Sequence, residues 1–225
     1  MPKIRGNPVS LASASYRLIT GKSEASEPKS TQERTKLVLE ALQEGGLTRT
    51  QAKQTLAGEA GVGVRTVERW AAGTQEAKDT ARGAHASALG SAVRAVRTPA
   101  SRVQSIRDAA TRAPSDPASA VTPAGGEDFS QEARDAAGRA SRLANDDNGL
   151  TITGDVTVSQ STQEGRTLKL GRWLPEGSLD HLPDVFRTGG AEAVAAEINR
   201  LIGQHYVAGM TVSNVTEIYF HTYET

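Results

Sequence analysis

The stretch TRTQAKQTLAGEAGVGVRTVERWAAG, residues 48–73, decides the architecture of the first half of the chain. Ala57 is small enough for two helices to cross closely, and Gly61, four residues later, can take the positive φ of a tight turn. Val67 follows six residues after Gly61 and can fill the space between the helices, and Gly73 can end the second one. The spacing predicts two short helices joined by a glycine turn, the helix-turn-helix arrangement.

The second of these predicted helices has an apolar side and a polar side. We expect Leu56, Val62 and Trp70 to complete the small core around Val67. The residues left on its outer side are Val64, Arg65, Thr66, Glu68 and Arg69. Arginine can donate two hydrogen bonds to guanine or pair with a phosphate, so these five residues form the predicted DNA-contacting face. The alternative is a helical hairpin whose polar face is merely solvated.

Composition limits the fold and the chemistry. Hydrophobic residues make up 37% of the 225 residues and aromatic residues only 4%, which favours two modest cores over one large core. The chain has no cysteine, so disulfide and thiol chemistry are excluded. No apolar run approaches the roughly 20 residues of a membrane span, and none resembles a secretory signal. We therefore expect a cytoplasmic, nucleoid-associated protein without a membrane partner.

Charge is unevenly distributed although the net charge is zero. Residues 1–113 hold 18 Lys and Arg against 10 Asp and Glu, whereas residues 114–225 hold 8 against 16. A basic half suits a phosphate backbone because neutralising phosphates releases counterions. DNA would repel the acidic half, which we expect to face proteins instead. Ordinary solvated surfaces in both halves remain the alternative.

The pattern along the chain predicts a mainly α N-terminal half with the helix-turn-helix, a flexible helical middle and a small α+β C-terminal domain. Residues 1–30 are polar and Ser-rich and are interpreted as a mobile arm. Residues 31–73 form the DNA-binding domain. Residues 74–148 combine Ala/Arg/Ser-rich helical segments, at 84–96 and 130–145, with a linker at 113–126. Residues 149–225 form the C-terminal domain, which we expect to fold alone.

Within the C-terminal domain, two periodicities alternate. The segment LTITGDVTVS, residues 150–159, alternates β-branched and polar residues and predicts a strand. A second strand is expected at 167–174, and short and long helices at 179–186 and 191–207, separated by Gly189 and Gly190. Residues 211–223 alternate again and predict a closing strand. The four histidines lack zinc-ligand spacing, so no metal or cofactor of the protein's own is expected.

Three segments resemble the telomeric terminal proteins of linear actinobacterial (Streptomyces-type) chromosomes and plasmids. GVGVRTVERWAAG, residues 61–73, is similar to the recognition region of that family. STQEGRTLKLGRWLP, residues 161–175, resembles its Ser-Thr, acid or amide, Arg and strand pattern. AEINRLIGQHYVAGMTVSNVTEIYF, residues 196–220, resembles its helix, Tyr, glycine and closing strand. The segments occur in the family's order, although its members are more basic than this chain.

The resemblance implies protein priming at a linear DNA end. A side-chain hydroxyl attacks the α-phosphate of the first deoxynucleotide, while a partner DNA polymerase supplies Mg²⁺ and base catalysis. The chain would then be a primer and not an enzyme. Matching the motif places Thr162 at the acceptor position, with Ser161 as the immediate alternative, Ser159 as a distant one, and Arg166 able to meet the incoming phosphates. The implied partners are telomere ends, the polymerase and a telomere-associated protein; a homo-oligomer is compatible.

Two other functions fit the same sequence. A helix-turn-helix transcriptional regulator of a plasmid or phage would use residues 149–225 for dimerisation or effector binding. A plasmid replication or partition adaptor would bind DNA without a covalent link. Residues 159–166 (SQSTQEGR) are expected to form an exposed polar loop between two strands, which is the position a priming hydroxyl needs.

Overall fold

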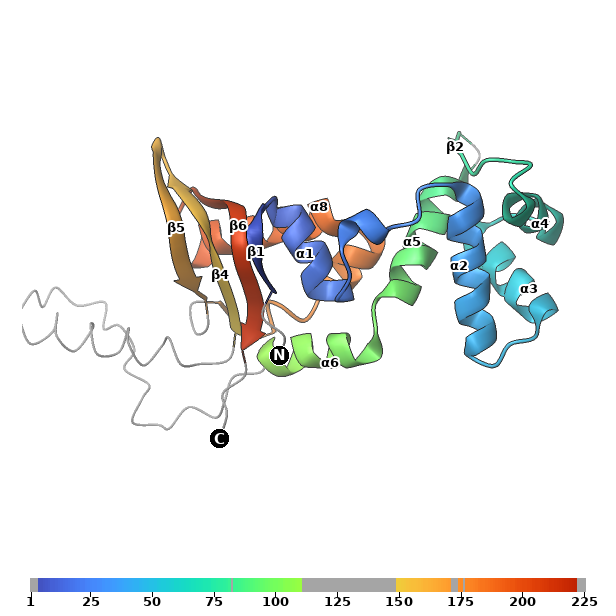
Figure 1. Cartoon of the computed structure of the whole chain (residues 1–225), viewed down its shortest axis with the longest axis horizontal. Helices are drawn as coiled ribbons and strands as arrows, with labels where there is room; N and C mark the ends of the chain where they lie inside the picture. The colour runs from blue at the N-terminus through green and yellow to red at the C-terminus, as the bar shows by residue number, and fades with distance from the viewer. Residues whose placement is uncertain (1–3, 82, 111–148, 171–173, 176, 222–225) are drawn as a thin grey trace, which may run out of the picture.

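Buried apolar side chains fall into two clusters, which lie at opposite ends of the molecule (Figure 1). The computed structural model describes residues 4–81, 83–110, 149–170, 174–175 and 177–221. One cluster lies between a four-stranded antiparallel sheet and its helices, and the other lies among helices alone. The predicted mixture of helices with a small sheet is therefore confirmed. We call the two parts the sheet body, formed by the described residues of 4–20, 100–110 and 149–221, and the helical body, formed by residues 31–97.

The sheet contains β1 (Ile4–Val9), β6 (Met210–His221), β4 (Gly149–Val158) and β5 (Ser161–Lys169), in that spatial order. Each neighbouring pair is antiparallel. Helices α1 (Leu11–Thr20) and α8 (Leu182–His205) pack on it, and β5 is left as one edge strand. β1 and β4 flank β6, so the first and last strands of the chain are direct neighbours.

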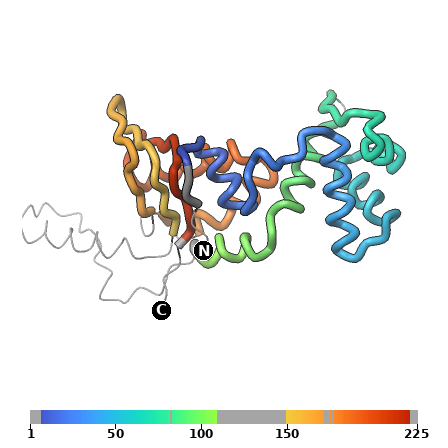
Figure 2. The backbone as a smooth tube through the Cα atoms, viewed as in Figure 1, coloured from blue at the N-terminus to red at the C-terminus, as the bar shows by residue number. Residues whose placement is uncertain are grey.

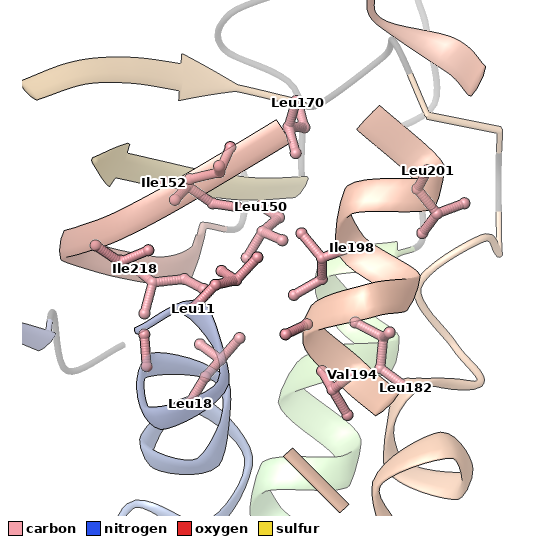
Figure 3. Close-up of a cluster of buried hydrophobic side chains, with 14 of the residues drawn as sticks. Leu11, Leu18, Leu150, Ile152, Leu170, Leu182, Val194, Ile198, Leu201 and Ile218 are labelled. Carbon is pink, nitrogen blue, oxygen red and sulfur yellow. The ribbon is translucent and has the colours of Figure 1, made fainter. Parts of the chain in front are cut away.

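The sheet core is built from alternate residues of the strands and one side of each helix. Leu150 and Ile152 of β4 and Ile218 of β6 are fully buried. Figure 3 shows Leu11 and Leu18 of α1 and Ile198 of α8 on the sides of their helices that face these strand residues, and Val194 of α8 belongs to the same cluster. The alternation predicted for 150–159 and 211–223 thus corresponds to β4 and β6.

The prediction of a mobile arm over residues 1–30 is wrong for residues 4–20, which form β1 and α1. β1 pairs with β6, with Ile4 opposite Ile218 and Val9 opposite Val215, and α1 contributes its apolar side to the sheet core. The Ser10 side chain caps α1 by accepting a hydrogen bond from the backbone N–H of Ser13 (3.0 Å), and Gly21 ends the helix in the left-handed conformation. Figure 2 shows this blue segment lying beside the red closing strand. The N-terminal segment therefore contributes a strand to the sheet as well as a helix.

Two other boundaries differ from the sequence predictions. The second strand, β5, covers Ser161–Lys169 and not 167–174, because the chain turns back after only two residues, Ser159 and Gln160. The two helices predicted at 179–186 and 191–207 correspond to the two parts of α8, which a kink at Gly190 (φ 74°, ψ −165°) separates where the sequence predicted a break; only the outer bounds differ, since α8 begins at Leu182 and ends at His205. The predicted linker at 113–126 and helix at 130–145 lie outside the described residues.

The helical body contains α2 (Thr31–Glu44), α3 (Arg49–Ala60), α4 (Val64–Ala72) and α5 (His85–Arg97), with a short hairpin of β2 (Asp79–Thr80) and β3 (Gly83–Ala84) between α4 and α5. α2 and α3 each begin with a capping box, in which the cap side chain and the third helical residue exchange hydrogen bonds. The helix predicted at 84–96 is α5. No helix in the described part of the chain is long and apolar enough to cross a membrane.

Two arginines of α5 join the bodies. Arg94 donates hydrogen bonds to the backbone carbonyls of Arg187 (2.9 Å) and Thr188 (3.0 Å), just before the kink in α8. Arg97 is buried and donates to the hydroxyl of Tyr16 in α1 (3.0 Å) and to the backbone carbonyl of Ser26 (2.6 Å). These contacts fix one end of the helical body against the sheet body. Helix α6 (Ala100–Ala110) then leads back along the sheet.

Candidate nucleic-acid interface

The stretch 48–73 folds as α3, a three-residue turn and α4. Gly61 ends α3 with φ 63° and ψ 36°, and its N–H bonds back to the α3 carbonyls. Gly63 precedes α4 with an extended backbone, and Gly73 ends α4 with φ 74°. A side chain at Gly61 would meet no other atom within 4 Å, so the turn needs glycine for its backbone conformation and not for space.

The apolar side of α4 is anchored by Val67 and Trp70, which are 0% and 1% exposed. They belong to the same cluster as Leu56 and Ala57 of α3, which are also buried as the sequence predicted, while Val62 is half-buried against it. This packing fixes the rotation of α4 about its own axis. The side opposite Val67 must therefore face away from the core.

Arg65 and Arg69 lie on that opposite side and are exposed. They are four residues apart, hence only about 40° apart around the helix axis. Within the described part of the chain, neither guanidinium has a recorded hydrogen bond or ion pair, so both are free to contact a ligand. These two residues match their predicted positions.

The other three predicted contact residues, Val64, Thr66 and Glu68, are less accessible to a ligand than the two arginines, or are already paired. Glu68 is exposed but accepts a hydrogen bond from the Lys53 ammonium of α3 at 2.7 Å, and this pairing lowers the pKa of the Glu68 carboxyl. Val64 and Thr66 are half-buried, because Val64 packs on the helical core and Thr66 lines a groove beside α4. Glu68 thus ties α4 to α3, and only its second oxygen remains for another partner.

Two grooves flank α4. The hairpin-side groove, of about 560 Å³, lies between α4 and the β2–β3 hairpin, and its lining includes Val62, Thr66, Trp70, Lys78, Thr80 and His85. The α3-side groove, of about 520 Å³, lies between α4 and helices α2 and α3, and its lining includes Lys36, Glu40, Arg49, Lys53, Glu68 and Ala72. Neither groove is lined by Arg65 or Arg69. Since Thr66 and Glu68 border opposite grooves, α4 forms a ridge between them, with both arginines on its crest.

The β2–β3 hairpin is held in place by the start of α5. The Asp79 carboxylate accepts hydrogen bonds from the backbone N–H groups of Ala86 (2.8 Å) and Ser87 (3.0 Å) and from the Ser87 hydroxyl (2.5 Å). These bonds, the hydroxyl's above all, lower the pKa of Asp79. His85 Nδ1 lies 2.9 Å from the Ala60 carbonyl at the end of α3. The hairpin-side groove therefore has a firm outer wall.

The predicted priming residues lie in the β4–β5 hairpin and not in a loop. Ser161 and Thr162 are the first residues of β5, opposite Val158 and Thr157, and both are exposed. The Thr162 hydroxyl lies 3.0 Å from that of Thr157. Arg166 is half-buried and donates to the Gln163 side chain at 2.7 Å. The predicted polar loop at 159–166 is thus shortened to a two-residue turn, in which Ser159 has a φ of 55°.

The structure does not bring the two sets of predicted residues together. Figure 1 shows α4 at one end of the molecule and the β4–β5 hairpin at the other. Among the described residues, no three His, Asp or Glu side chains gather as a metal site. No protein-family model, curated protein or solved structure matches this chain.

Sequence reasoning missed the cations beside α4. Lys36 and Arg49 are exposed in the α3-side groove and Lys78 in the hairpin-side groove. Each is a lone basic residue on a different element, so no run or periodic pattern marks them in the sequence. The Lys53–Glu68 pair joins residues 15 apart on different helices and was equally hidden.

Proposed function

We propose that this protein binds duplex DNA by inserting α4 into the major groove. The observation that carries the proposal is the crest of α4, where Arg65 and Arg69 are exposed on the side opposite the buried Val67, while Val67 and Trp70 together anchor the helix to the core. The buried pair fixes the direction of the arginines, and neither guanidinium forms a hydrogen bond or ion pair within the described residues, which leaves both available. α3, the glycine turn and α4 would then act as a helix-turn-helix unit.

The chemistry of the crest favours base recognition. The major groove admits an α-helix, and arginine reads guanine by two hydrogen bonds to O6 and N7. Glu68 is held by Lys53, which leaves it a positioning role between the two helices. Thr66 and Val64, half-buried, would contact the DNA only at their outer atoms.

The test begins with selection of a preferred duplex from a random-sequence pool. Arg65→Ala and Arg69→Ala should each weaken binding to that duplex by about 1–3 kcal/mol and relax the preference at one position. Arg187→Ala is the matched control, because it removes an arginine of the sheet body that pairs with Asp184. Wild-type affinity and preference in both α4 variants would refute the proposal.

A second function, protein priming at a DNA end, is favoured by the exposure of two adjacent hydroxyls at the β4–β5 turn. We propose Thr162 as the acceptor and Ser161 as its alternative. The Thr162 oxygen would form a bond to the α-phosphorus of a deoxynucleotide, pyrophosphate would leave, and the hydroxyl proton would pass to a base of the partner polymerase. The polymerase also supplies Mg²⁺. Because α4 lies at the far end, the polymerase could hold the hairpin without displacing bound DNA.

Threonine pairs within the sheet give this second function a matched control. Thr162 pairs with Thr157 (3.0 Å), and Thr167 on the same strand pairs with Thr153 (2.9 Å) in the same way. In a priming assay with labelled deoxynucleotide, the host polymerase and a telomere-associated protein, Thr162→Ala should lose the labelled adduct and Thr167→Ala should keep it. Loss of the labelled adduct in Ser161→Ala but not in Thr162→Ala would identify Ser161 as the acceptor. If neither hydroxyl matters and no adduct forms, the protein is a DNA-binding regulator instead.

A further inference from the structure

Because α4 forms a ridge between two grooves, a further inference can be drawn about how DNA would lie on the protein. This inference rests on the proposed DNA binding. A protein surface that enters the major groove must make room for the two phosphate backbones bordering that groove. B-DNA has a major groove about 12 Å wide, and an α-helix with its side chains is about 10–12 Å across. A helix that fills the groove therefore has one backbone at each flank, which is where the two grooves beside α4 lie.

The α3-side groove offers cations from two elements. Lys36 comes from α2 and Arg49 from the first turn of α3, and both are exposed without a hydrogen bond or ion pair in the described residues, although Glu68 lies close enough to Arg49 to interact with it electrostatically. Lys53 is engaged by Glu68, so Lys36 and Arg49 are the available charges. Glu40 opposes them from α2 and would repel a phosphate in the same groove.

The hairpin-side groove offers one cation and several polar side chains. Lys78 is exposed just before β2 and has no recorded partner among the described residues. Gln75 and Thr66 add neutral donors, which also serve as phosphate contacts in protein–DNA complexes. The carboxylate of Glu76 accepts a hydrogen bond from the Thr31 hydroxyl, which occupies one of its oxygens.

We propose that the two grooves receive the two phosphate backbones of duplex DNA, with Lys36 and Arg49 contacting one strand and Lys78 the other. Arg65 and Arg69 on the crest read the bases between them. The arrangement requires both strands at once, so the partner is a duplex and not a single strand. Contacts to phosphate position the protein and carry no sequence information, whereas contacts to bases do.

Salt titration of duplex binding separates these roles. For B-DNA the slope of log K against log salt is about −0.9 per phosphate contact. Lys36→Gln, Arg49→Gln and Lys78→Gln should each reduce the steepness of that slope by about 0.9 and leave the sequence preference unchanged. Glu40→Gln should act in the opposite sense and tighten binding at low salt. Lys22→Gln and Glu192→Gln change exposed charges of other parts of the chain and serve as controls.

Each outcome decides between the possibilities. A reduced slope for Lys36→Gln and Arg49→Gln with a wild-type slope for Lys78→Gln would mean contact with one strand, which overturns the inference. Unchanged slopes in all three, with sequence preference still lost in Arg65→Ala and Arg69→Ala, would overturn it while the proposed DNA binding stands. Equal binding and slope on single-stranded DNA would overturn the duplex assignment. Absence of any DNA binding by the wild type would remove the proposed function itself. Matching thermal melts of all variants would show that the exposed substitutions leave the fold intact.

Discussion

The helical body and the sheet body form their cores from different parts of the chain and from different types of residue. The helical body takes its buried apolar residues from one continuous stretch, 38–93, and combines four alanines with leucines, valines and one aromatic ring, that of Trp70. The sheet body joins residues 11–19 and Ile106 to residues 150–220 and fills its core mainly with leucine, isoleucine and phenylalanine. The first body depends on local pairing and small residues, and the second on long-range pairing and apolar bulk.

The difference predicts unequal stability. At 67 residues the helical body is close to the size below which a single core rarely supplies more than about 3–5 kcal/mol. Its attachment to the sheet body through Arg94 and Arg97 therefore matters. A marginal body that presents α4 is also free to adjust to a ligand, while the sheet body remains a firm base.

The largest expected effect follows from the dependence of the sheet body on its N-terminal segment. Removing residues 1–20 would delete β1 and several buried side chains, of which the four large apolar ones are Leu11, Tyr16, Leu18 and Ile19. At about 1.5–3 kcal/mol each, their loss amounts to about 6–12 kcal/mol, which is comparable with the total stability of about 5–15 kcal/mol of an ordinary protein. The shortened chain should show no cooperative sheet melt by circular dichroism. A fragment of residues 149–225 that melts cooperatively would contradict this result and restore the sequence-based expectation that it folds alone.

This dependence also shows where sequence analysis succeeded and where it failed. The turn at Gly61, the burial of Val67 and Trp70 and the crest arginines were predictable, because they depend on residues within one helical hairpin. The local signal for α1 was present as well: Ser10 as a cap, Leu11, Leu18 and Ile19 at helical spacing, and Gly21 at the end. It was outweighed by the polar composition of residues 1–30. The pairing of β1 with β6 joins residues more than 200 apart, and no local pattern reveals such a pairing.

A second comparison substitutes one fully buried aromatic ring in each body. Trp70→Ala and Phe186→Ala each remove a fully buried ring and should each cost about 3–5 kcal/mol. For the helical body that cost equals its whole expected stability, so Trp70→Ala should unfold it and abolish DNA binding while the sheet body still melts normally. Differential scanning calorimetry with residue-resolved hydrogen exchange would follow both bodies. A single transition lowered equally by either variant would instead show that the two bodies unfold as one unit.

Two glycines, Gly58 within α3 and Gly61 directly after it, provide a test with smaller effects, which should have opposite signs. Gly61→Ala places a side chain at a φ of 63° and should cost about 1–2 kcal/mol, although nothing lies within 4 Å of the added atom. Gly58→Ala lies in the helix itself, also in open space, and should stabilise the helical body by about 0.5–1 kcal/mol. The effect of each substitution is measured as a change in the melting temperature of the helical body. Equal effects of the two would mean that Gly61 does not form the turn.

The smallest effect expected is a difference in acid sensitivity between the bodies. In the helical body the pKa values of Glu33, Glu68 and Asp79 are lowered, by backbone N–H groups, by Lys53 and by the Ser87 hydroxyl respectively. In the described sheet body the pKa of Glu197 is lowered in the same way, first by its hydrogen bond to Arg200. A carboxyl whose pKa is lower in the folded state stabilises the fold above its unfolded pKa of about 4, and this contribution disappears as the pH falls through the folded value.

The helical body should therefore lose more stability than the sheet body when the pH is lowered from about 6 to about 3. Because the three carboxylates are exposed, the difference will be modest and best seen at low salt, where surface charges are screened least. Replacing them together, as Glu33→Gln, Glu68→Gln and Asp79→Asn, should lower the melting temperature of the helical body near neutral pH and flatten its acid dependence. Glu197→Gln is the control, since it should flatten only the acid dependence of the sheet body. If the triple variant keeps the wild-type acid dependence, these pairings do not hold α2, α4 and the β2–β3 hairpin in place, and the walls of the two grooves must depend on apolar packing alone.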